Sequence, residues 1–126
     1  MSRTILLIED NEQNRYLATF LLERHGHRVV SAFDGPSGIA MARSLAPDLI
    51  LLDIQLPGMD GYQVAGALRL IPALAATPVV AVTSYAMVGD RERALGAGCN
   101  GYIEKPINPD TFAGEIARFL DGPPPP

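Results

Sequence analysis

The sequence has 126 residues, of which 48% are hydrophobic and 19% are charged, and its formal net charge is -4 at pH 7. This length predicts a single domain with a hydrophobic core of its own. The negative net charge, without a cluster of lysines and arginines, disfavours a nucleic-acid-binding surface. Neither a signal peptide nor an apolar run of about 20 residues is recognisable, so we expect a cytoplasmic protein that does not insert into membranes.

Taken in chain order, five short runs have the composition of β-strands. They cover residues 4–9, 27–32, 49–53, 78–83 and 100–104. The first, third and fourth runs are continuously apolar, which is typical of parallel strands whose two faces are both covered by helices. The run at 27–32 is more polar, and we therefore expect it to lie nearer an edge of the sheet.

Each strand-like run is followed by a segment with a helical pattern. These segments cover residues 11–24, 35–45, 62–70 and 88–95, and a last helix begins near Asp110 and carries Phe112, Ile116, Phe119 and Leu120 on one face. Five β-α pairs with right-handed crossovers predict an α/β protein with a doubly wound parallel sheet and helices on both faces. Residues 122–126 are Gly and four prolines, which we interpret as a disordered tail or the start of a linker.

Four of the strand-like runs lead into reactive polar residues. Glu9 ends the first run and Asp10 follows it, Asp53 ends the third, Thr83 ends the fourth and Lys105 follows the fifth. Because ligands bind beyond the carboxyl ends of the strands in an open parallel sheet, we expect these side chains to meet at one edge. Such a set of three carboxylates, a hydroxyl and an ammonium can hold a divalent cation and a phosphoryl group together.

Asp53 is the strongest candidate for a reacting group. A carboxylate can attack phosphorus and form an aspartyl phosphate. Glu9 and Asp10 supply oxygen ligands for a hard cation such as Mg²⁺, which offsets the negative charge of the reactants. Lys105 can pair with one phosphoryl oxygen, and Thr83 can donate a hydrogen bond to another. This chemistry depends on positioning and electrostatic stabilisation rather than on an acid–base relay.

Four motifs in this order and at this spacing closely resemble the receiver domains of two-component response regulators. They are Ile8-Glu9-Asp10-Asn11, Leu51-Leu52-Asp53 with Pro57-Gly58-Met59-Asp60-Gly61, Val82-Thr83-Ser84, and Tyr102-Ile103-Glu104-Lys105-Pro106. The resemblance covers residues 3 to about 121, and residues 86–99 are further similar to the receivers of hybrid histidine kinases and of DivK-type single-domain regulators. It implies a receiver domain over residues 1–121, with a (βα)5 fold and a five-stranded parallel sheet of flavodoxin-like order 2-1-3-4-5.

The resemblance also implies a role for each matching residue. Asp53 matches the phosphoacceptor and Lys105 the phosphate-pairing lysine, and the Lys105-Pro106 bond is expected to be cis. The remaining implied roles are ligands of Mg²⁺ (or Mn²⁺ in its place), switch residues and residues that tune dephosphorylation: Glu9, Asp10, Asp53 and the backbone carbonyl of Gln55 for the metal, Thr83 and Tyr102 for the switch, Gln55 and Tyr85 for tuning. Glu9 replaces the commoner aspartate and is one methylene longer, so we expect metal binding to persist with altered geometry.

These features predict a phosphorylation-dependent signalling switch rather than an enzyme. Asp53 would accept a phosphoryl group from a sensor histidine kinase or a histidine phosphotransfer protein, with self-catalysed phosphorylation and autodephosphorylation. A downstream protein would then bind the changed surface, which we expect on the helix that begins at Val88, the strand that contains Tyr102 and the last helix. The protein is expected to be a monomer or a weak dimer.

Three alternatives compete with a free single-domain regulator. The chain could be a receiver module excised from a larger hybrid kinase or multidomain regulator. It could be an aspartyl-phosphate phosphatase, although Gln55 stands where such enzymes usually have a second aspartate. It could also be a docking module that works without phosphorylation, which would leave an intact site idle.

Other features of the sequence have plainer interpretations. Residues 96–101 match G-x-G-x-x-G, but they close a helix and enter a strand, so we expect helix termination rather than nucleotide binding. Cys99 is the single cysteine and is interpreted as a small core residue. The remaining residues of note are interpreted as turn or surface positions: Asp34, Gly35, Asp60, Gly61, His25, His27 and the mixed charges at 90–93.

Overall fold

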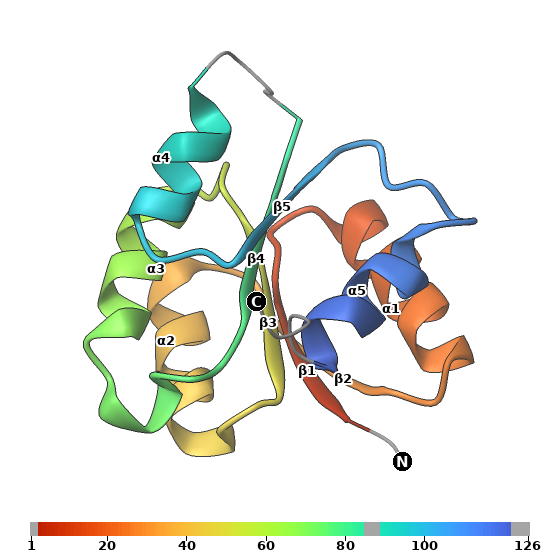
Figure 1. The fold of residues 1–126 in the computed structure, drawn as a ribbon, viewed down its shortest axis with the longest axis horizontal. Helices are drawn as coiled ribbons and strands as arrows, with labels where there is room; N and C mark the ends of the chain where they lie inside the picture. Colours follow the sequence, from red (N-terminus) through yellow and green to blue (C-terminus); the bar gives the residue numbers. More distant parts are fainter. Residues whose placement is uncertain (1–2, 85–88, 122–126) are drawn as a thin grey trace.

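The computed structural model describes residues 3–84 and 89–121, which form a five-stranded parallel sheet flanked by helices (Figure 1). The strand order is β2-β1-β3-β4-β5, which confirms the predicted α/β doubly wound sheet of flavodoxin-like order 2-1-3-4-5. The polar run at 27–32 corresponds to an edge strand, as expected. The strands are β1 (Thr4–Ile8), β2 (Arg28–Ala32), β3 (Leu49–Asp53), β4 (Val79–Thr83) and β5 (Gly101–Glu104).

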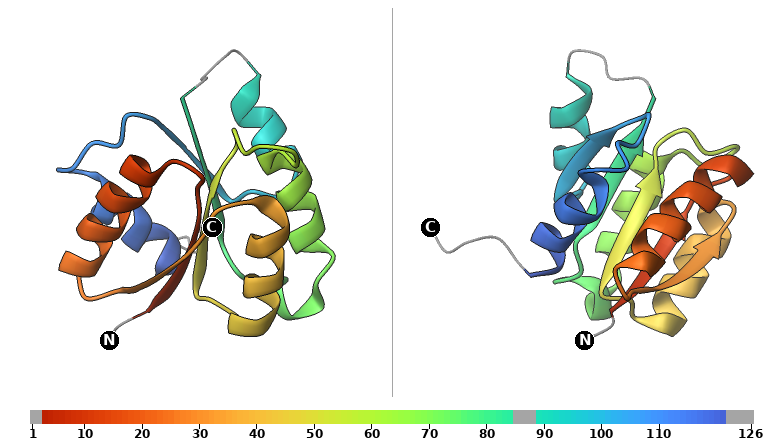
Figure 2. Two further views of the ribbon diagram at one scale, coloured as in Figure 1. Left: turned by 180° about the vertical axis from the view of Figure 1, so that it is seen from behind. Right: turned by 90° about the vertical axis from the view of Figure 1, so that its right-hand side faces the viewer.

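Helices cover both faces of the sheet. They are α1 (Glu12–Arg24), α2 (Gly35–Leu45), α3 (Gly61–Arg69), α4 (Asp90–Gly96) and α5 (Phe112–Leu120), with a 3-10 turn, η1 (Pro72–Leu74), after α3. The two helices α1 and α5 lie on one face, and α2, α3 and α4 lie on the other (Figure 2). In β1, Ile5 and Leu7 join the core under the first pair, while Leu6 and Ile8 join the core under the other three. This burial on both sides explains why the strands are continuously apolar.

The helix boundaries differ from the predicted ones by at most two residues, and those of α2 agree with the prediction. Helix α1 begins at Glu12 because Asn11 caps it, with the Asn11 side chain accepting from the backbone N–H of Asn14 at 2.9 Å. The predicted helix over 88–95 corresponds to α4, and residues 85–88 lie outside the described part of the chain. The 3-10 turn η1 was not predicted, since its sequence shows only a proline that stops α3.

Asp60 and Gly61 are more than the turn residues that the sequence suggests. The Asp60 carboxylate accepts from the Gln63 backbone N–H and the Gln63 side chain accepts from the Asp60 N–H, both at 3.0 Å, which forms a capping box for α3. Gly61 is buried, and its N–H donates to the carbonyl of Ile54 at 2.9 Å. A Cβ at Gly61 would lie 2.5 Å from the Ile54 Cα and 2.7 Å from the carbonyl oxygen of Asp53. The start of α3 is therefore pressed against the end of β3.

Among the other residues interpreted as turn or surface positions, Gly35 and His27 need correction, whereas Asp34 and His25 do not. Asp34 caps α2 by accepting from the Ser37 N–H at 2.8 Å, and Gly35 behind it is buried. His27 is half-buried, and its Nδ1 has no hydrogen-bond partner among the described residues. His25 is exposed, as predicted. The corrected residues lie where a strand passes into a helix or a helix into a strand, so their burial depends on tertiary packing.

Residues 96–101 terminate a helix and lead into a strand, as predicted. Helix α4 ends at Gly96 and β5 begins at Gly101, with Gly98 at a φ of 114°. The Arg69 side chain crosses from α3 to this connection, where its Nε donates to the Gly98 carbonyl at 2.8 Å and its Nη2 to Asn100 Oδ1 at 2.7 Å. The glycines thus serve chain reversal and close packing.

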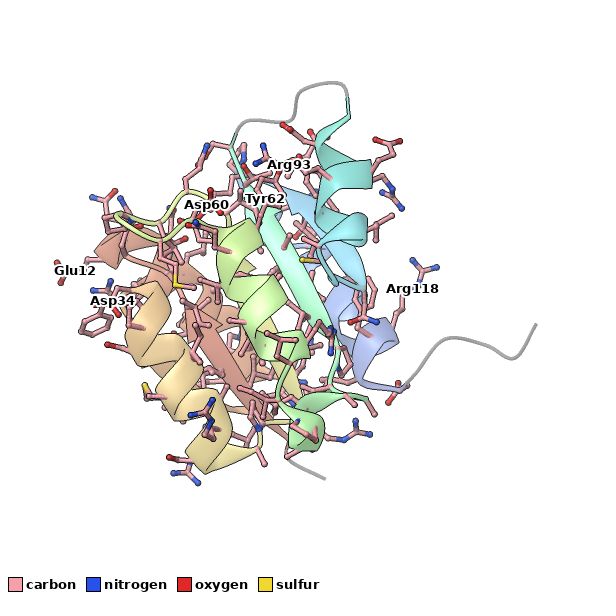
Figure 3. All side chains as sticks on the ribbon, turned by 90° about the vertical axis from the view of Figure 1, so that its left-hand side faces the viewer. Glu12, Asp34, Asp60, Tyr62, Arg93 and Arg118 are labelled. Carbon is pink, nitrogen blue, oxygen red and sulfur yellow. The ribbon has the colours of Figure 1, made fainter. Side chains whose placement is uncertain are left out.

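Two further predictions concern side chains in or next to α4, those of Cys99 and Arg93. Cys99 is a buried free thiol, and burial raises its pKa to about 11, which makes it an inert core residue. Arg93 is exposed but is more than a solvated charge, because its guanidinium carbon lies 4.1 Å from the ring centroid of Tyr62 and links α4 to α3 (Figure 3). None of the described helices combines the length and the apolarity needed to span a bilayer.

Two glycines of α3 provide a matched test of this packing. Gly61→Ala should lower the free energy of unfolding by about 2 kcal/mol or more, since the new methyl group would overlap rigid backbone at the end of β3. Gly66→Ala, in the same helix with open space around it, should raise stability by about 0.5–1 kcal/mol. Urea denaturation of both variants measures the difference, and equal stabilities would contradict the proposed close approach.

Candidate functional site

The polar residues at the strand ends meet at the carboxyl edge of the sheet. The register places Ile8 opposite Leu52, so β1 and β3 end side by side, and Asp53 pairs with β4. Glu9, Asp53 and Thr83 are the buried polar residues of the described chain, with only 3%, 4% and 2% of their surface exposed. Burying carboxylates is costly unless they are paired or bind a cation, and such clusters mark candidate functional sites.

Lys105 lies between two of the buried acids. Its Nζ is 2.7 Å from Glu9 Oε1 and 3.4 Å from Asp53 Oδ2, and only 9% of its side chain is exposed. The Lys105 backbone N–H donates to the carbonyl of Thr83 at 2.8 Å, which fixes the turn after β5 against the end of β4. The peptide bond between Lys105 and Pro106 is cis. One ammonium group therefore serves both carboxylates.

The Asp53 carboxylate is oriented by its own loop as well as by Lys105. Asp53 Oδ1 accepts from the Gln55 backbone N–H at 3.0 Å, while Oδ2 faces the Lys105 ammonium. A carboxylate held at both oxygens loses rotational freedom before any reaction takes place. This arrangement suits a group that must attack a substrate from a fixed direction.

The side-chain carboxyl group of Glu9 has a raised pKa in this site. Burial, followed by the hydrogen bond with the neighbouring Asp53 side chain, raises the pKa of Glu9 from 4.5 to about 7, and Lys105 offsets this only in part. The site therefore contains more negative charge than its one ammonium can balance. A bound divalent cation would remove this imbalance.

Three carboxylates in this cluster can hold a metal ion. Oxygen atoms of Glu9, Asp10 and Asp53 all lie within 4.8 Å of one another. Glu9 and Asp53 are buried and Asp10 is exposed, so an ion bound here would be reached from solvent on one side. An all-oxygen set of carboxylates fits a hard cation such as Mg²⁺.

The turn that carries Glu9 and Asp10 is held by a residue that the sequence did not single out. Arg15 Nη1 donates to the carbonyl of Glu9 at 3.0 Å and to the carbonyl of Asp10 at 2.9 Å. The backbone N–H of Asn11 also donates to Glu9 Oε2 at 3.3 Å. The only signal in the sequence is an arginine five residues after Asp10, which is too common a feature to predict a role.

The residues predicted to tune or report the site differ in where the structure places them. Thr83 is buried at the end of β4. Tyr102 is half-buried and packs against the core under α2, α3 and α4, and its hydroxyl has no hydrogen-bond partner among the described residues. The Gln55 Oε1 lies 3.5 Å from the Ser84 N–H, which brings the loops after β3 and β4 together. Tyr85 falls outside the described residues.

The sequence matches a known family over most of its length. Residues 5–117 match the family model of the response regulator receiver domain. The chain is also 40% identical over 120 residues to the polar-differentiation response regulator DivK of Brucella ovis, with 95% of this chain and 98% of DivK covered.

Solved structures give the same result. The receiver domain of the sensor histidine kinase PA1611 from Pseudomonas aeruginosa, with a magnesium ion coordinated in its active site cleft, is similar with a TM-score of 0.83 and 35% identity, and 96% of each chain is covered. The chemotaxis protein CheY4 of Vibrio cholerae is similar with a TM-score of 0.88 and 25% identity, covering 94% of this chain and 98% of CheY4.

The raised pKa of Glu9 predicts that the metal-free protein becomes less stable as pH rises from about 4.5 to 7. The unfolded chain loses this proton at the lower pH and the folded chain keeps it until the higher pH, so the unfolded state binds fewer protons between them. The loss should reach about 3 kcal/mol at most, at ~1.4 kcal/mol per pKa unit.

Glu9→Gln is the control for this pH dependence, because it keeps the size of the side chain and cannot ionise. Urea denaturation in the presence of a chelator should give a wild-type stability that falls relative to Glu9→Gln across this range. The comparison also cancels His27, whose burial-lowered pKa acts in the opposite direction, with stability rising as pH passes the ordinary histidine value. Parallel curves for the two proteins would show that Glu9 ionises as in an unfolded chain.

Proposed function

The chain belongs to the family of response regulator receiver domains, and from this premise we propose that it is a phosphorylation-dependent signalling switch whose phosphoacceptor is Asp53. The observation that carries the proposal is the buried arrangement of Asp53, Glu9 and Lys105 at the carboxyl edge of the sheet. The proposed domain spans residues 1–121, and 122–126 form a tail or the start of a linker.

In the proposed reaction, a carboxylate oxygen of Asp53 attacks the phosphorus of a phosphohistidine on a sensor histidine kinase or a histidine phosphotransfer protein. A P–O bond to Asp53 forms while the P–N bond to the imidazole breaks, and the ring nitrogen keeps the electron pair. Later attack by water on the acyl phosphate returns the Asp53 carboxylate and inorganic phosphate. The hydrogen bond from the Gln55 N–H keeps the carboxylate from rotating away.

The proposed ligands of Mg²⁺, with Mn²⁺ as an alternative, are Glu9, Asp10, Asp53 and the backbone carbonyl of Gln55. When bound, the ion supplies charge neutralisation for the acids and for the transferred phosphoryl group. The three carboxylates in reach of one ion support this, as does the magnesium ion in the similar Pseudomonas receiver. The extra methylene of Glu9 is compatible with this role because its oxygens still reach the cluster.

Lys105 is proposed to pair with a phosphoryl oxygen once Asp53 is modified. An ammonium group carries three donors, and in the structure it is already within 3.4 Å of Asp53. Its shorter contact, 2.7 Å, is with Glu9. Phosphorylation therefore brings an added dianionic group into competition with Glu9 for the same cation, which would redistribute the contacts of Lys105.

Thr83 and Tyr102 are the proposed readout of this event. Thr83 is buried beside the acid cluster at the end of β4, and Tyr102 lies on the neighbouring strand β5, with Ala81 as its partner in the register. A hydroxyl drawn toward the phosphoryl group would leave space for the tyrosine ring to move. The surface formed by α4, β5 and α5 would then change for a downstream protein.

Several finer points belong to the same proposal. Gln55 and Tyr85 are proposed to tune dephosphorylation, and the Gln55 contact with Ser84 places its amide at the rim of the site. Gln55 in place of a second aspartate argues against a phosphatase that acts on external substrates. A cytoplasmic location and a monomeric or weakly dimeric state stay predictions, as does origin from a free regulator rather than a larger hybrid kinase.

Acetyl phosphate with Mg²⁺ should add one phosphoryl group to the wild-type protein and none to Asp53→Asn. Intact-protein mass spectrometry measures this, with quenching in acid to preserve the acyl phosphate. Asp110→Asn, an exposed aspartate near the start of α5, is the matched control and should react like wild type. Equal modification of Asp53→Asn and wild type would place the phosphoacceptor elsewhere.

Thr83→Ala should accept the phosphoryl group but fail to transmit it. In wild type, beryllofluoride with Mg²⁺ should shift the NMR signals of β5 and α5, while in Thr83→Ala only signals near Asp53 should move. Thr83→Ser keeps the hydroxyl and should restore the long-range shifts. If the signals of β5 and α5 in Thr83→Ala still shift as they do in wild type, Thr83 has no part in the readout.

A further inference from the structure

Arg15 makes three contacts that all concern the turn after β1. Its Nη1 group donates to the main-chain carbonyls of Glu9 and Asp10. Its guanidinium carbon lies 4.1 Å from the ring centroid of Phe33. A flat, delocalised cation stacked on an aromatic ring keeps its N–H groups free to point sideways, so the stack orients the donors rather than using them.

Phe33 is itself linked to the same turn. It follows Ala32, the last residue of β2, and the carbonyl of Ala32 accepts the backbone N–H of Glu9 at 3.0 Å. Glu9 is thus held at its N–H by Ala32, at the end of β2, and at its carbonyl by Arg15. Arg15 in turn packs on Phe33, the residue that follows Ala32. The contacts form a closed ring through Glu9, Arg15, Phe33 and Ala32, so the main chain of Glu9 cannot shift without breaking one of them.

The positive charge of Arg15 and its contacts with the turn should have opposite effects on the binding of a cation. A positive group beside a cation site weakens the binding of that cation by Coulomb repulsion. The same group strengthens binding if it holds the ligands' main chain in place, because the ion then does not have to order the turn. The two effects have opposite signs, and a single measurement of cation affinity separates them.

We propose that Arg15, braced by Phe33, is a positioning residue that fixes the main chain of Glu9 and Asp10 for binding of a divalent cation. The inference rests on the proposed function, which places the cation among these acids. It adds to the site a residue that contacts neither the metal nor Asp53. It also accounts for the position of Phe33, an aromatic residue that is 58% exposed.

Helix α1 contains a natural control for this role. Arg24 also lies over an aromatic ring, at the longer distance of 5.7 Å between its guanidinium carbon and the centroid of Phe20. It lies at the opposite end of α1 from the acid pair, because α1 runs from Glu12 to Arg24. Replacing Arg24 therefore removes the same charge and the same kind of contact without touching the turn.

The test is a calorimetric titration of unphosphorylated protein with MgCl₂ at constant ionic strength. Arg15→Met should bind Mg²⁺ about tenfold more weakly than wild type, the lower end of the range for losing an outer partner of a metal ligand. Arg15→Lys keeps the charge but not the flat stack on Phe33, and it should also bind more weakly. Arg24→Met should bind like wild type.

Tighter or unchanged Mg²⁺ binding in Arg15→Met would overturn the proposal, because positioning by Arg15 would then not outweigh its charge repulsion. A purely structural role would lower the melting temperature by the same amount with and without Mg²⁺. The positioning role instead predicts that the melting temperature gained on adding Mg²⁺ becomes smaller in Arg15→Met.

Phe33→Leu keeps the test valid if Arg15→Met does not fold, since it changes an exposed side chain and leaves Arg15 in place. It should weaken Mg²⁺ binding by about two- to threefold, and an affinity equal to wild type would remove Phe33 from the proposal. Failure of the proposed function looks different: wild type would bind Mg²⁺ but would not be modified by acetyl phosphate.

Discussion

The ammonium of Lys105, held between the buried carboxylates of Glu9 and Asp53, is the interaction on which the rest of the site depends. Taking charges out of water is costly, and one cation cannot balance two anions. Burial, followed by the hydrogen bond with the Asp53 side chain, raises the pKa of Glu9. A parallel sheet makes this cluster unavoidable, because its carboxyl ends lie at one edge and the register sets Asp53 beside the end of β1. The site therefore carries an excess of negative charge that a bound divalent cation would neutralise.

Glu9 affects how the positive charge of Lys105 is divided between the two buried acids. A longer acid at this position reaches Lys105 at 2.7 Å, whereas Asp53 is 3.4 Å from the same ammonium. Part of the positive charge is thereby drawn toward Glu9 before any phosphoryl group is present. The Asp53 carboxylate is left with a weaker contact on that side and a hydrogen bond from Gln55 on the other. In the proposed reaction, a carboxylate held in place but not fully neutralised would keep its reactivity toward phosphorus.

Sequence alone predicted the parts of this protein that follow from chain direction and periodicity. Apolar runs on strands buried on both faces identify β1, β3 and β4, and their polar ends identify Asp53 and its neighbours because all parallel strands end at the same edge. Contacts that depend on three-dimensional closure were missed. Arg15 reaches back only because α1 leaves the turn in a particular direction, and Gly61 is buried only because α3 is pressed against β3. Polar and small residues of this kind occur in every surface loop, so composition gives no warning of their roles.

The helices that surround the site differ in how firmly their first turns are fixed. Asn11, Asp34 and Asp60 cap α1, α2 and α3 through side-chain hydrogen bonds, and each such cap stabilises a helix by roughly 1 kcal/mol. Helix α4 begins after Gly89, which has no side chain to cap it, and it is only seven residues long. Its position depends on tertiary contacts such as that of Arg93 with Tyr62. The first turns of α1, α2 and α3 are thus fixed by side-chain caps, whereas α4, next to β5, lacks such a cap and depends on tertiary contacts. The proposed switch would use this difference, because a fixed site and a less firmly held surface would allow one phosphoryl group to be reported to a partner.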